Sequence, residues 1–257
     1  MNELQDKGQD HTWMWALSAH RGPVMEDEDH IEAVRLRLGI AGPIDVTPCG
    51  LCGQIAMDSS GAHALCCAKA ESTRGHHSVT RQLADEIRCA DPTLASEPTG
   101  LIPGTELRPA DILTGALDNG LTAPDIGIFS PDASDAGDDC TRSMACRKQD
   151  KYRGHQAALD RQNMVYQPLT SSCYVRLSSD TTAILRTLAQ RIARRRGCSA
   201  REWRFRRLRS KLVTHIWARA GRMVRSCWPD REPEAADEEV MSAALSAGTM
   251  AVRPPDS

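Results

Sequence analysis

Apolar residues recur at helical spacing in four stretches of the chain. Residues 30–38 form a short amphipathic pattern that ends at Gly39, and residues 79–89 carry apolar side chains every four positions. A third helix is predicted over residues 180–197. A fourth opens at Ser199 with the sequence Ser-Ala-Arg-Glu, which is a capping box, and continues with one apolar stripe. These stretches predict helices that bury one face.

Shorter apolar runs lie between the second and third helical stretches. The runs within residues 93–98, 106–113, 123–129 and 164–169 predict strands, and residues 147–159 predict another helix. The order is therefore helix, three strands, helix and strand. This order predicts an α/β sandwich built around a small sheet flanked by helices.

The second and third predicted strands each carry one aspartate. A segment with Gly and Asn at residues 115–120 separates them and supplies a turn, so the two strands can form a hairpin. Pairing the strands brings Asp111 and Asp125 to neighbouring positions at one edge of the sheet. Two carboxylates held this close repel each other, and a divalent cation such as Mg²⁺ relieves that repulsion. The alternative is that both are ordinary strand-end or turn residues.

A proline precedes each of these aspartates. Pro109 lies two residues before Asp111, and Pro124 directly precedes Asp125. Because proline interrupts the hydrogen bonding of a strand, we expect each aspartate at a strand end, where its charge can face a cleft.

Composition narrows the class of protein. The 257 residues are 40% hydrophobic and only 4% aromatic, so we expect a core of aliphatic side chains. A mean hydropathy of −0.43 and the lack of a long apolar run argue against a membrane span. The first residues show no apolar signal-peptide core, so we expect an intracellular protein. Ten cysteines in such a chain favour metal ligands or free thiols over disulfides.

A cysteine and histidine motif follows the first helix. Cys49, Cys52, His63 and Cys67 have the spacing C-x2-C-x10-H-x3-C, with glycines that permit a tight turn. Thiolate and imidazole ligands at this spacing suit tetrahedral Zn²⁺. Cys66 competes with Cys67 for the fourth position. The alternative is a set of unrelated reduced cysteines.

The net charge of −2 conceals an asymmetry along the chain. Residues 142–225 are rich in arginine, whereas residues 230–239 are acidic. Acids are scarce in residues 191–225, so ion pairs within one helix cannot neutralise the arginines. This pattern favours contacts with the phosphates of DNA or RNA, although a solvated helix face is the alternative. Residues 131–139 form an acidic segment that we expect to be a mobile loop.

The order of these motifs resembles a known family. The chain is similar, over roughly residues 36–227, to the restriction-like endonuclease segment of site-specific non-LTR retrotransposon polyproteins, a branch of the PD-(D/E)XK nuclease superfamily. The residues that carry the resemblance are Leu38-Gly39, Cys49, Cys52, His63, Cys67, Gly75-His76, Arg108-Pro109-Ala110-Asp111, Asp125, Pro131 and Lys151-Tyr152.

The resemblance implies a restriction-endonuclease-like fold and a metal-dependent nuclease. Asp111 and Asp125 would hold Mg²⁺ for the hydrolysis of DNA phosphodiester bonds. The superfamily pattern places a lysine two residues after the second acid, where this chain has Gly127. Some members carry the lysine on the following helix, which points to Lys151, with Lys148 as the second candidate.

Further expectations follow from the same resemblance. Glu97 is a candidate outer carboxylate, and His76 is a candidate metal ligand or phosphate contact. A detached piece of a retrotransposon would act on DNA and could also contact RNA. We would expect it in the nucleus. The alternative is an inactive zinc-knuckle remnant that only binds nucleic acid. The expected organisation is a lead-in (1–44), a CCHC zinc knuckle (45–80), a nuclease-like core (81–178), a basic helical region (179–228) and a disordered acidic tail (229–257).

Overall fold

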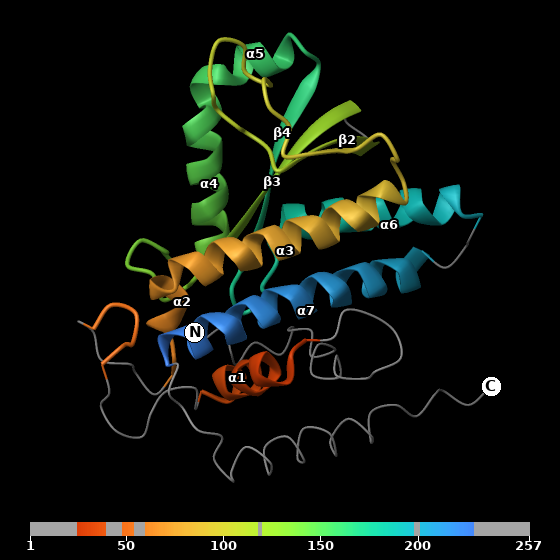
Figure 1. Cartoon of the computed structure of the whole chain (residues 1–257). Helices are drawn as coiled ribbons and strands as arrows, with labels where there is room; N and C mark the ends of the chain where they lie inside the picture. The colour runs from red at the N-terminus through yellow and green to blue at the C-terminus, as the bar shows by residue number, and fades with distance from the viewer. Residues whose placement is uncertain (1–24, 40–47, 54–59, 118–119, 198–200, 229–257) are drawn as a thin grey trace, which may run out of the picture. The chain divides into compact units, whose positions relative to one another are not determined.

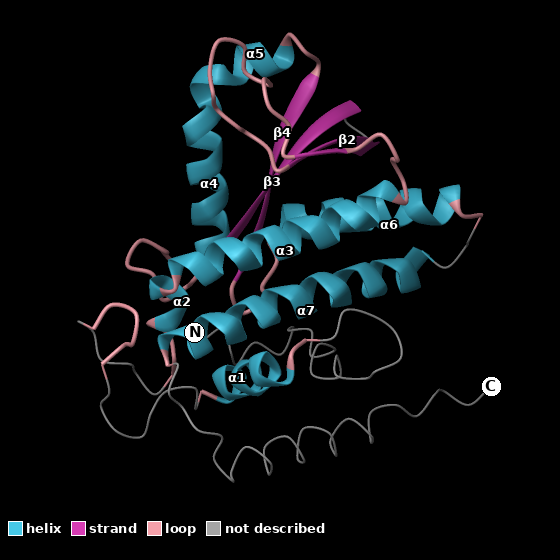
Figure 2. Cartoon of the chain, in the orientation of Figure 1, coloured by secondary structure: helices cyan, strands magenta, loops and turns pink. Residues whose placement is uncertain are grey.

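The computed structural model describes residues 25–39, 48–53, 60–117, 120–197 and 201–228 (Figures 1 and 2). The chain divides into two compact units. The first comprises residues 1–73 and 217–257, and the second comprises residues 74–216. The division falls within two long helices, α3 (Lys69–Arg88) and α7 (Arg201–Cys227). The expected lead-in before residue 25 and the expected tail after residue 228 lie outside the described residues.

The second unit contains a four-stranded mixed sheet. Its strands are β1 (Ala95–Ser96), β2 (Ile112–Leu117), β3 (Gly120–Phe129) and β4 (Met164–Ser172), in the order β1-β2-β3-β4. The pairs β1–β2 and β2–β3 are antiparallel, whereas β3–β4 is parallel. The predicted hairpin is therefore confirmed, as is the α/β class with a small sheet flanked by helices.

A helical crossover joins the two parallel strands. It consists of α4 (Cys140–Tyr152), a 3-10 turn (Arg153–His155) and α5 (Gln156–Asp160). Parallel neighbours require such a crossover, because a tight turn reverses the chain. Helix α4 starts seven residues earlier than the sequence pattern indicates, because Asp139 caps it by accepting hydrogen bonds from the amides of Thr141 and Arg142.

Helices pack on the sheet, and the apolar stripe predicted within residues 79–89 is buried. Helix α4 packs on β3 and β4, and α6 (Ser179–Arg195) packs on β2 and β4 (Figure 1). In α3, the predicted stripe of Val79, Leu83 and Ile87 is buried. One core cluster fills the space at the crossover; its buried members are Leu101, Ile102, Ala110, Ala123, Tyr152, Leu159 and Met164.

The acidic segment between β3 and α4 makes contacts with distant residues. Tyr174 donates a hydrogen bond to Asp132 at 2.7 Å, and Arg147 forms an ion pair with Asp135 at 2.5 Å. Asp139 ends the segment as the cap of α4. Partners distant in sequence therefore contact two acids of this segment, and its expected mobility stays a prediction.

The first unit contains α1 (Asp27–Leu38), α2 (Ala64–Cys67) and the end of α7. Gly39 ends α1 in the left-handed conformation, with φ of 73°, as the sequence predicts. Gly221 of α7 lets α1 approach closely: a Cβ atom there would lie 2.1 Å from the carbonyl oxygen of Asp29.

Several cations of α7 have partners outside their own helix, whereas Arg206 pairs with Glu202 within it. Within the first unit, Asp29 contacts Arg222 at 3.3 Å and Arg225 at 3.0 Å. Within the second unit, Lys211 forms an ion pair with Glu86. Acids are scarce within α7, as the sequence shows, but other helices supply the counter-charges. Part of the basic stretch is therefore structural.

No helix among the described residues is long and apolar enough to span a membrane.

Candidate functional site

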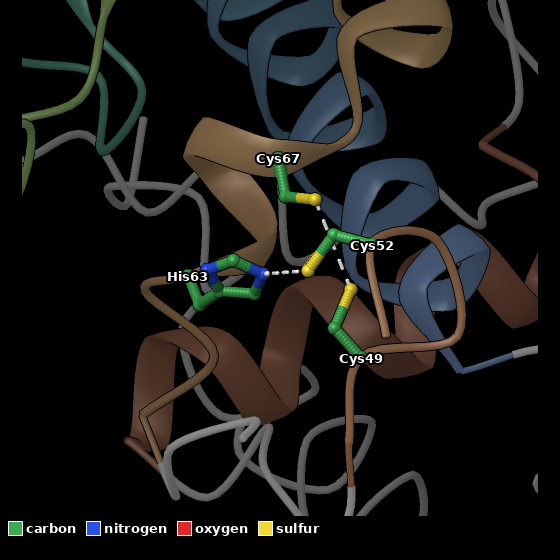
Figure 3. Close-up of side chains that lie close together, drawn as sticks. All are labelled: Cys49, Cys52, His63 and Cys67. Atoms are coloured by element: carbon green, nitrogen blue, oxygen red, sulfur yellow. Dashed lines mark hydrogen bonds between the residues drawn. The ribbon is translucent and has the colours of Figure 1, made fainter. Parts of the chain in front are cut away.

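A cluster of three cysteines and one histidine lies in the first unit (Figure 3). The Sγ atoms of Cys49 and Cys67 are 3.8 Å apart, and Cys52 Sγ lies 3.5 Å from His63 Nε2. All four ligand atoms lie within 4.8 Å of one another. Among the described residues, this is the one group of three or more His, Cys, Asp or Glu side chains that could share a metal ion.

The cluster has the dimensions of a tetrahedral zinc site. Zn–S bonds of about 2.3 Å place two sulfurs about 3.75 Å apart at the tetrahedral angle, and a Zn–N bond of about 2.05 Å gives an S–N edge of about 3.6 Å. The observed distances of 3.8 and 3.5 Å match these edges. The four side chains could therefore hold a metal with only small movements.

Helix α2 decides between the two candidate cysteines. Cys66 and Cys67 are consecutive in α2, so their side chains point about 100° apart. Cys67 faces the cluster, whereas Cys66 is exposed. The choice of Cys67 as a ligand candidate agrees with the structure.

The surroundings of the cluster shift the pKa values of Cys49 and Cys67 in opposite directions. Burial raises the pKa of Cys49, but hydrogen bonds from the backbone amides of Cys52 and Leu51 outweigh burial and lower it. Burial, together with the neighbouring thiols of Cys49 and Cys52, raises the pKa of Cys67 to about 11. A binding metal would therefore displace protons from the cluster.

A second group of titratable side chains lies in the second unit, at the sheet. The backbone amide of Asp111 donates to the carbonyl of Pro124 at 3.0 Å, and the amide of Ile126 donates to Asp111 Oδ2 at 2.7 Å. These bonds hold Asp111 beside Asp125. The structure thus brings together the two aspartates that the sequence pairs.

Asp125 does not lie at a strand end. It lies within β3, opposite Pro168 of β4, and the residue is 9% exposed. Pro124 is accommodated inside the strand, so the expectation that it marks a strand end was wrong. Asp111 lies directly before β2, as expected.

Three side chains contact the two aspartates. Lys148 Nζ of α4 lies 2.6 Å from Asp125 Oδ1, and the hydroxyl of Tyr166 on β4 donates to Asp125 Oδ2 at 2.5 Å. On the other side, His76 Nε2 of α3 lies 3.3 Å from Asp111 Oδ1. We call His76, Asp111, Asp125, Lys148 and Tyr166 the acid cluster.

The environment separates the two carboxyl groups electrostatically. Burial alone would raise the pKa of Asp111, but the hydrogen bond and charge of His76 and the amide of Ile126 lower it. Burial raises the pKa of Asp125, and Lys148 and Tyr166 offset this only in part. Burial and the charge of Asp125 raise the pKa of Tyr166, so its hydroxyl stays a donor. Paired acids with divergent environments are typical of sites that need one charged and one protonatable group.

Lys148, rather than Lys151, meets the second acid. The side chain of Lys148 crosses over Gly127: a Cβ atom at residue 127 would lie 2.7 Å from Lys148 Cε and 2.8 Å from Met144 Cγ. Lys151 is exposed, and its ammonium lies 4.9 Å from the centre of the Tyr152 ring. The helix lysine thus occupies the space above Gly127.

The other acids near the sheet have different surroundings. Glu97 is exposed, and its backbone amide donates to the carbonyl of Asp111 at 2.7 Å. Asp91 is buried and accepts hydrogen bonds from Thr93, Thr114 and the amide of Gly115. Asp91 therefore ties the end of α3 to β2 and is structural.

The acid cluster offers few ligands to a metal. Two carboxylates suit Mg²⁺, which usually takes one or two from a protein and completes its octahedron with water and phosphate oxygens. Each carboxylate oxygen of Asp111 and Asp125 already accepts one bond, and a carboxylate oxygen has a second lone pair available. The residues are compatible with Mg²⁺ and do not by themselves require it.

Comparison of the chain with protein-family models, with curated proteins and with solved structures found no match.

Proposed function

We propose that the second unit is a metal-dependent DNA endonuclease domain of the PD-(D/E)XK type, derived from a retrotransposon polyprotein. We also propose that the Cys3His cluster holds a structural zinc ion. The observation that carries the nuclease proposal is the passage of Lys148 over Gly127 to Asp125. It accounts for the absence of a lysine at residue 127 in an otherwise matching motif.

The geometry at Gly127 supports a transfer of the lysine from strand to helix. Residues 125 and 127 of β3 point to the same face, since side chains alternate along a strand. A lysine at residue 127 would extend over the face where Lys148 now lies. Gly127 leaves that space open, so the ammonium group of Lys148 on α4 reaches Asp125.

Each residue of the acid cluster has a role in the proposed hydrolysis. Asp111 and Asp125 would hold Mg²⁺, which when bound polarises the phosphoryl oxygen and lowers the pKa of a bound water. Lys148 would stabilise negative charge that develops at the phosphate. Tyr166 and His76 would hold the two carboxylates in position through the hydrogen bonds described above.

The arginines of the basic helices would bind the DNA backbone. Arg207 of α7 is exposed, and Arg204 and Arg209 of the same helix are half-buried. Contacts of this kind neutralise phosphates without reading sequence, and they weaken steeply with salt. Replacing Arg204, Arg207 and Arg209 with glutamine should flatten the salt dependence of DNA affinity. An unchanged slope would remove these arginines from the proposed interface.

One observation favours the alternative of an inactive nucleic-acid-binding module. The pKa of Asp125 is raised by burial, and both its oxygens have protein partners. A metal at Asp125 would have to use the remaining lone pairs of these oxygens or replace one of their protein partners. In the binding-module alternative, Lys148 and Tyr166 permanently occupy the position of the metal.

A lysine-transfer experiment tests the nuclease proposal. Nicking of supercoiled plasmid DNA is measured with Mg²⁺ for the unmodified protein, Lys148→Ala, Lys151→Ala and the double variant Lys148→Ala/Gly127→Lys. We expect Lys148→Ala to lose most of the activity, Lys151→Ala to keep it, and the double variant to recover part of it. Full activity in Lys148→Ala would contradict the role given to Lys148. No Mg²⁺-dependent nicking by the unmodified protein would favour the binding module.

A further inference from the structure

A fourth sulfur lies beside the three sulfurs and one imidazole nitrogen of the Cys3His cluster. Cys227 is the last residue of α7 and is 1% exposed. Burial raises the pKa of its thiol, and hydrogen bonding with the thiols of Cys49 and Cys67 raises it further. The distance of 160 residues between Cys67 and Cys227 hides this proximity from any motif based on spacing.

Cys227 is a neighbour of the four ligand atoms rather than one of them. Four atoms, from Cys49, Cys52, His63 and Cys67, lie within 4.8 Å of one another, and Cys227 Sγ does not belong to that group. Two of the distances between these four atoms, 3.8 and 3.5 Å, match the edges of a tetrahedron around zinc. An additional thiol beside a set of four ligand atoms has the position of a hydrogen-bond donor to a ligand.

A backbone hydrogen bond fixes Cys227 against the knuckle. The amide of Gly50 donates to the carbonyl oxygen of Cys227 at 2.8 Å. The last four carbonyls of a helix have no partner within the helix, so the turn between Cys49 and Cys52 satisfies one of them at the end of α7. The blue ribbon of α7 passes beside this turn in Figure 3.

The negative charge of a zinc-bound centre would be stabilised by a hydrogen bond from the Cys227 thiol. Three thiolates and one neutral imidazole around Zn²⁺ carry a net charge of about −1 in a partly buried place. Hydrogen-bond donors to the thiolates stabilise that charge and orient the ligands. The amides of Leu51 and Cys52 already donate to Cys49. A protonated Cys227 adds a donor from a different part of the chain.

We propose that Cys227 is a supporting residue of the metal centre: its S–H group donates to the thiolate of Cys49, and the bound metal thereby holds the end of α7. This inference rests on the proposed zinc site and is independent of the nuclease proposal. It adds residue 227 to a site that the sequence confines to residues 49–67.

Metal affinity tests the first half of the proposal. Zinc competition with a chromophoric chelator is measured for the full chain and for Cys227→Ala, Cys227→Ser and Cys173→Ala. Removing a partner of a metal ligand typically costs 10- to 100-fold in affinity, and we expect that loss for Cys227→Ala. Cys227→Ser keeps a donor and should recover most of the affinity. Cys173 is equally buried, at 1%, but lies in the second unit, so Cys173→Ala controls for loss of a buried thiol.

Three results would overturn the inference. Equal zinc affinity for Cys227→Ala and Cys173→Ala would remove Cys227 from the centre. A changed visible spectrum of the Co²⁺-substituted Cys227→Ser protein, relative to the unmodified protein, would make Cys227 a direct ligand. Failure of the unmodified protein to bind zinc would end both this inference and the zinc proposal.

Amide hydrogen exchange tests the second half. Removal of zinc with a chelator should accelerate exchange at residues 48–53 and also at residues 224–228. The end of α6, at residues 191–195, should be unaffected. Acceleration confined to residues 48–67 would contradict the coupling between the metal and α7.

Discussion

Replacing Lys148 with methionine should destabilise the protein in a pH-dependent way. Methionine keeps most of the aliphatic stem but removes the ammonium that lies 2.6 Å from Asp125. The side chains of this pair are only 19% and 12% exposed, so solvent screens it weakly. Removing one partner of a buried ion pair costs about 3–5 kcal/mol. Because Tyr166 still donates to Asp125, we expect a loss near the lower end, about 3 kcal/mol at pH 8.

The pH dependence follows from the pKa of Asp125. Burial already raises this pKa, and the loss of Lys148 raises it further. A raised carboxyl pKa in the folded state lowers stability as pH rises, because the folded state retains a proton that the unfolded state has lost. The difference between variant and unmodified protein should therefore grow between pH 5 and pH 8.

Urea unfolding at several pH values measures this effect, and Lys151→Met is the matched control. Lys151 is exposed and contacts the ring of Tyr152, an interaction worth at most about 1 kcal/mol. Its replacement should cost little. Equal losses for the two variants, or a loss for Lys148→Met that does not depend on pH, would refute the pairing of Lys148 with Asp125.

Three further predictions concern the first unit. Gly221→Ala should destabilise the protein by about 1–3 kcal/mol despite the better helix propensity of alanine, because its Cβ would lie 2.1 Å from a backbone oxygen of α1. Thermal unfolding measures this change, and a stabilised variant would contradict the close approach of α1 and α7. Burial, opposed by Arg225 and Arg222, raises the pKa of Asp29 from 3.8 to about 6, and this difference corresponds to at most about 3 kcal/mol. Stability relative to Asp29→Asn should therefore fall as pH rises from 4 to 7, and a flat difference would contradict the raised pKa. Purified protein should carry about one zinc per chain, and elemental analysis measures this. Cys67→Ser should lose the zinc and Cys66→Ser should keep it. The reverse result would make Cys66, rather than Cys67, the fourth ligand.

The sequence predicts the local elements of the fold well. The helices and the hairpin follow from apolar periodicity and from residues such as Gly39, which acts within one turn of the chain. The Cys3His cluster follows from short spacings, and the turn between Cys49 and Cys52 is local. Cys227 could not be found in this way, because only the path of α7 brings it to the cluster.

The choice of lysine also depends on tertiary structure. Lys148 and Lys151 are three residues apart on α4, so both lie on nearly the same face and periodicity cannot separate them. The contact with Gly127 selects Lys148. Tyr166 was missed because its position depends on the β3–β4 register, which pairs it with Ala123, next to the proline before Asp125.

The central claim is that Asp111 and Asp125 form a hydrolytic metal site, and Asp111→Ala tests it most directly. Nicking of plasmid DNA with Mg²⁺ or Mn²⁺ and DNA affinity are measured on the same preparations of the unmodified protein and the variant. We predict that the variant loses nicking and keeps DNA affinity, since removing an acid does not weaken attraction to phosphates. Nicking that survives in the variant, or no nicking by the unmodified protein, would contradict the claim.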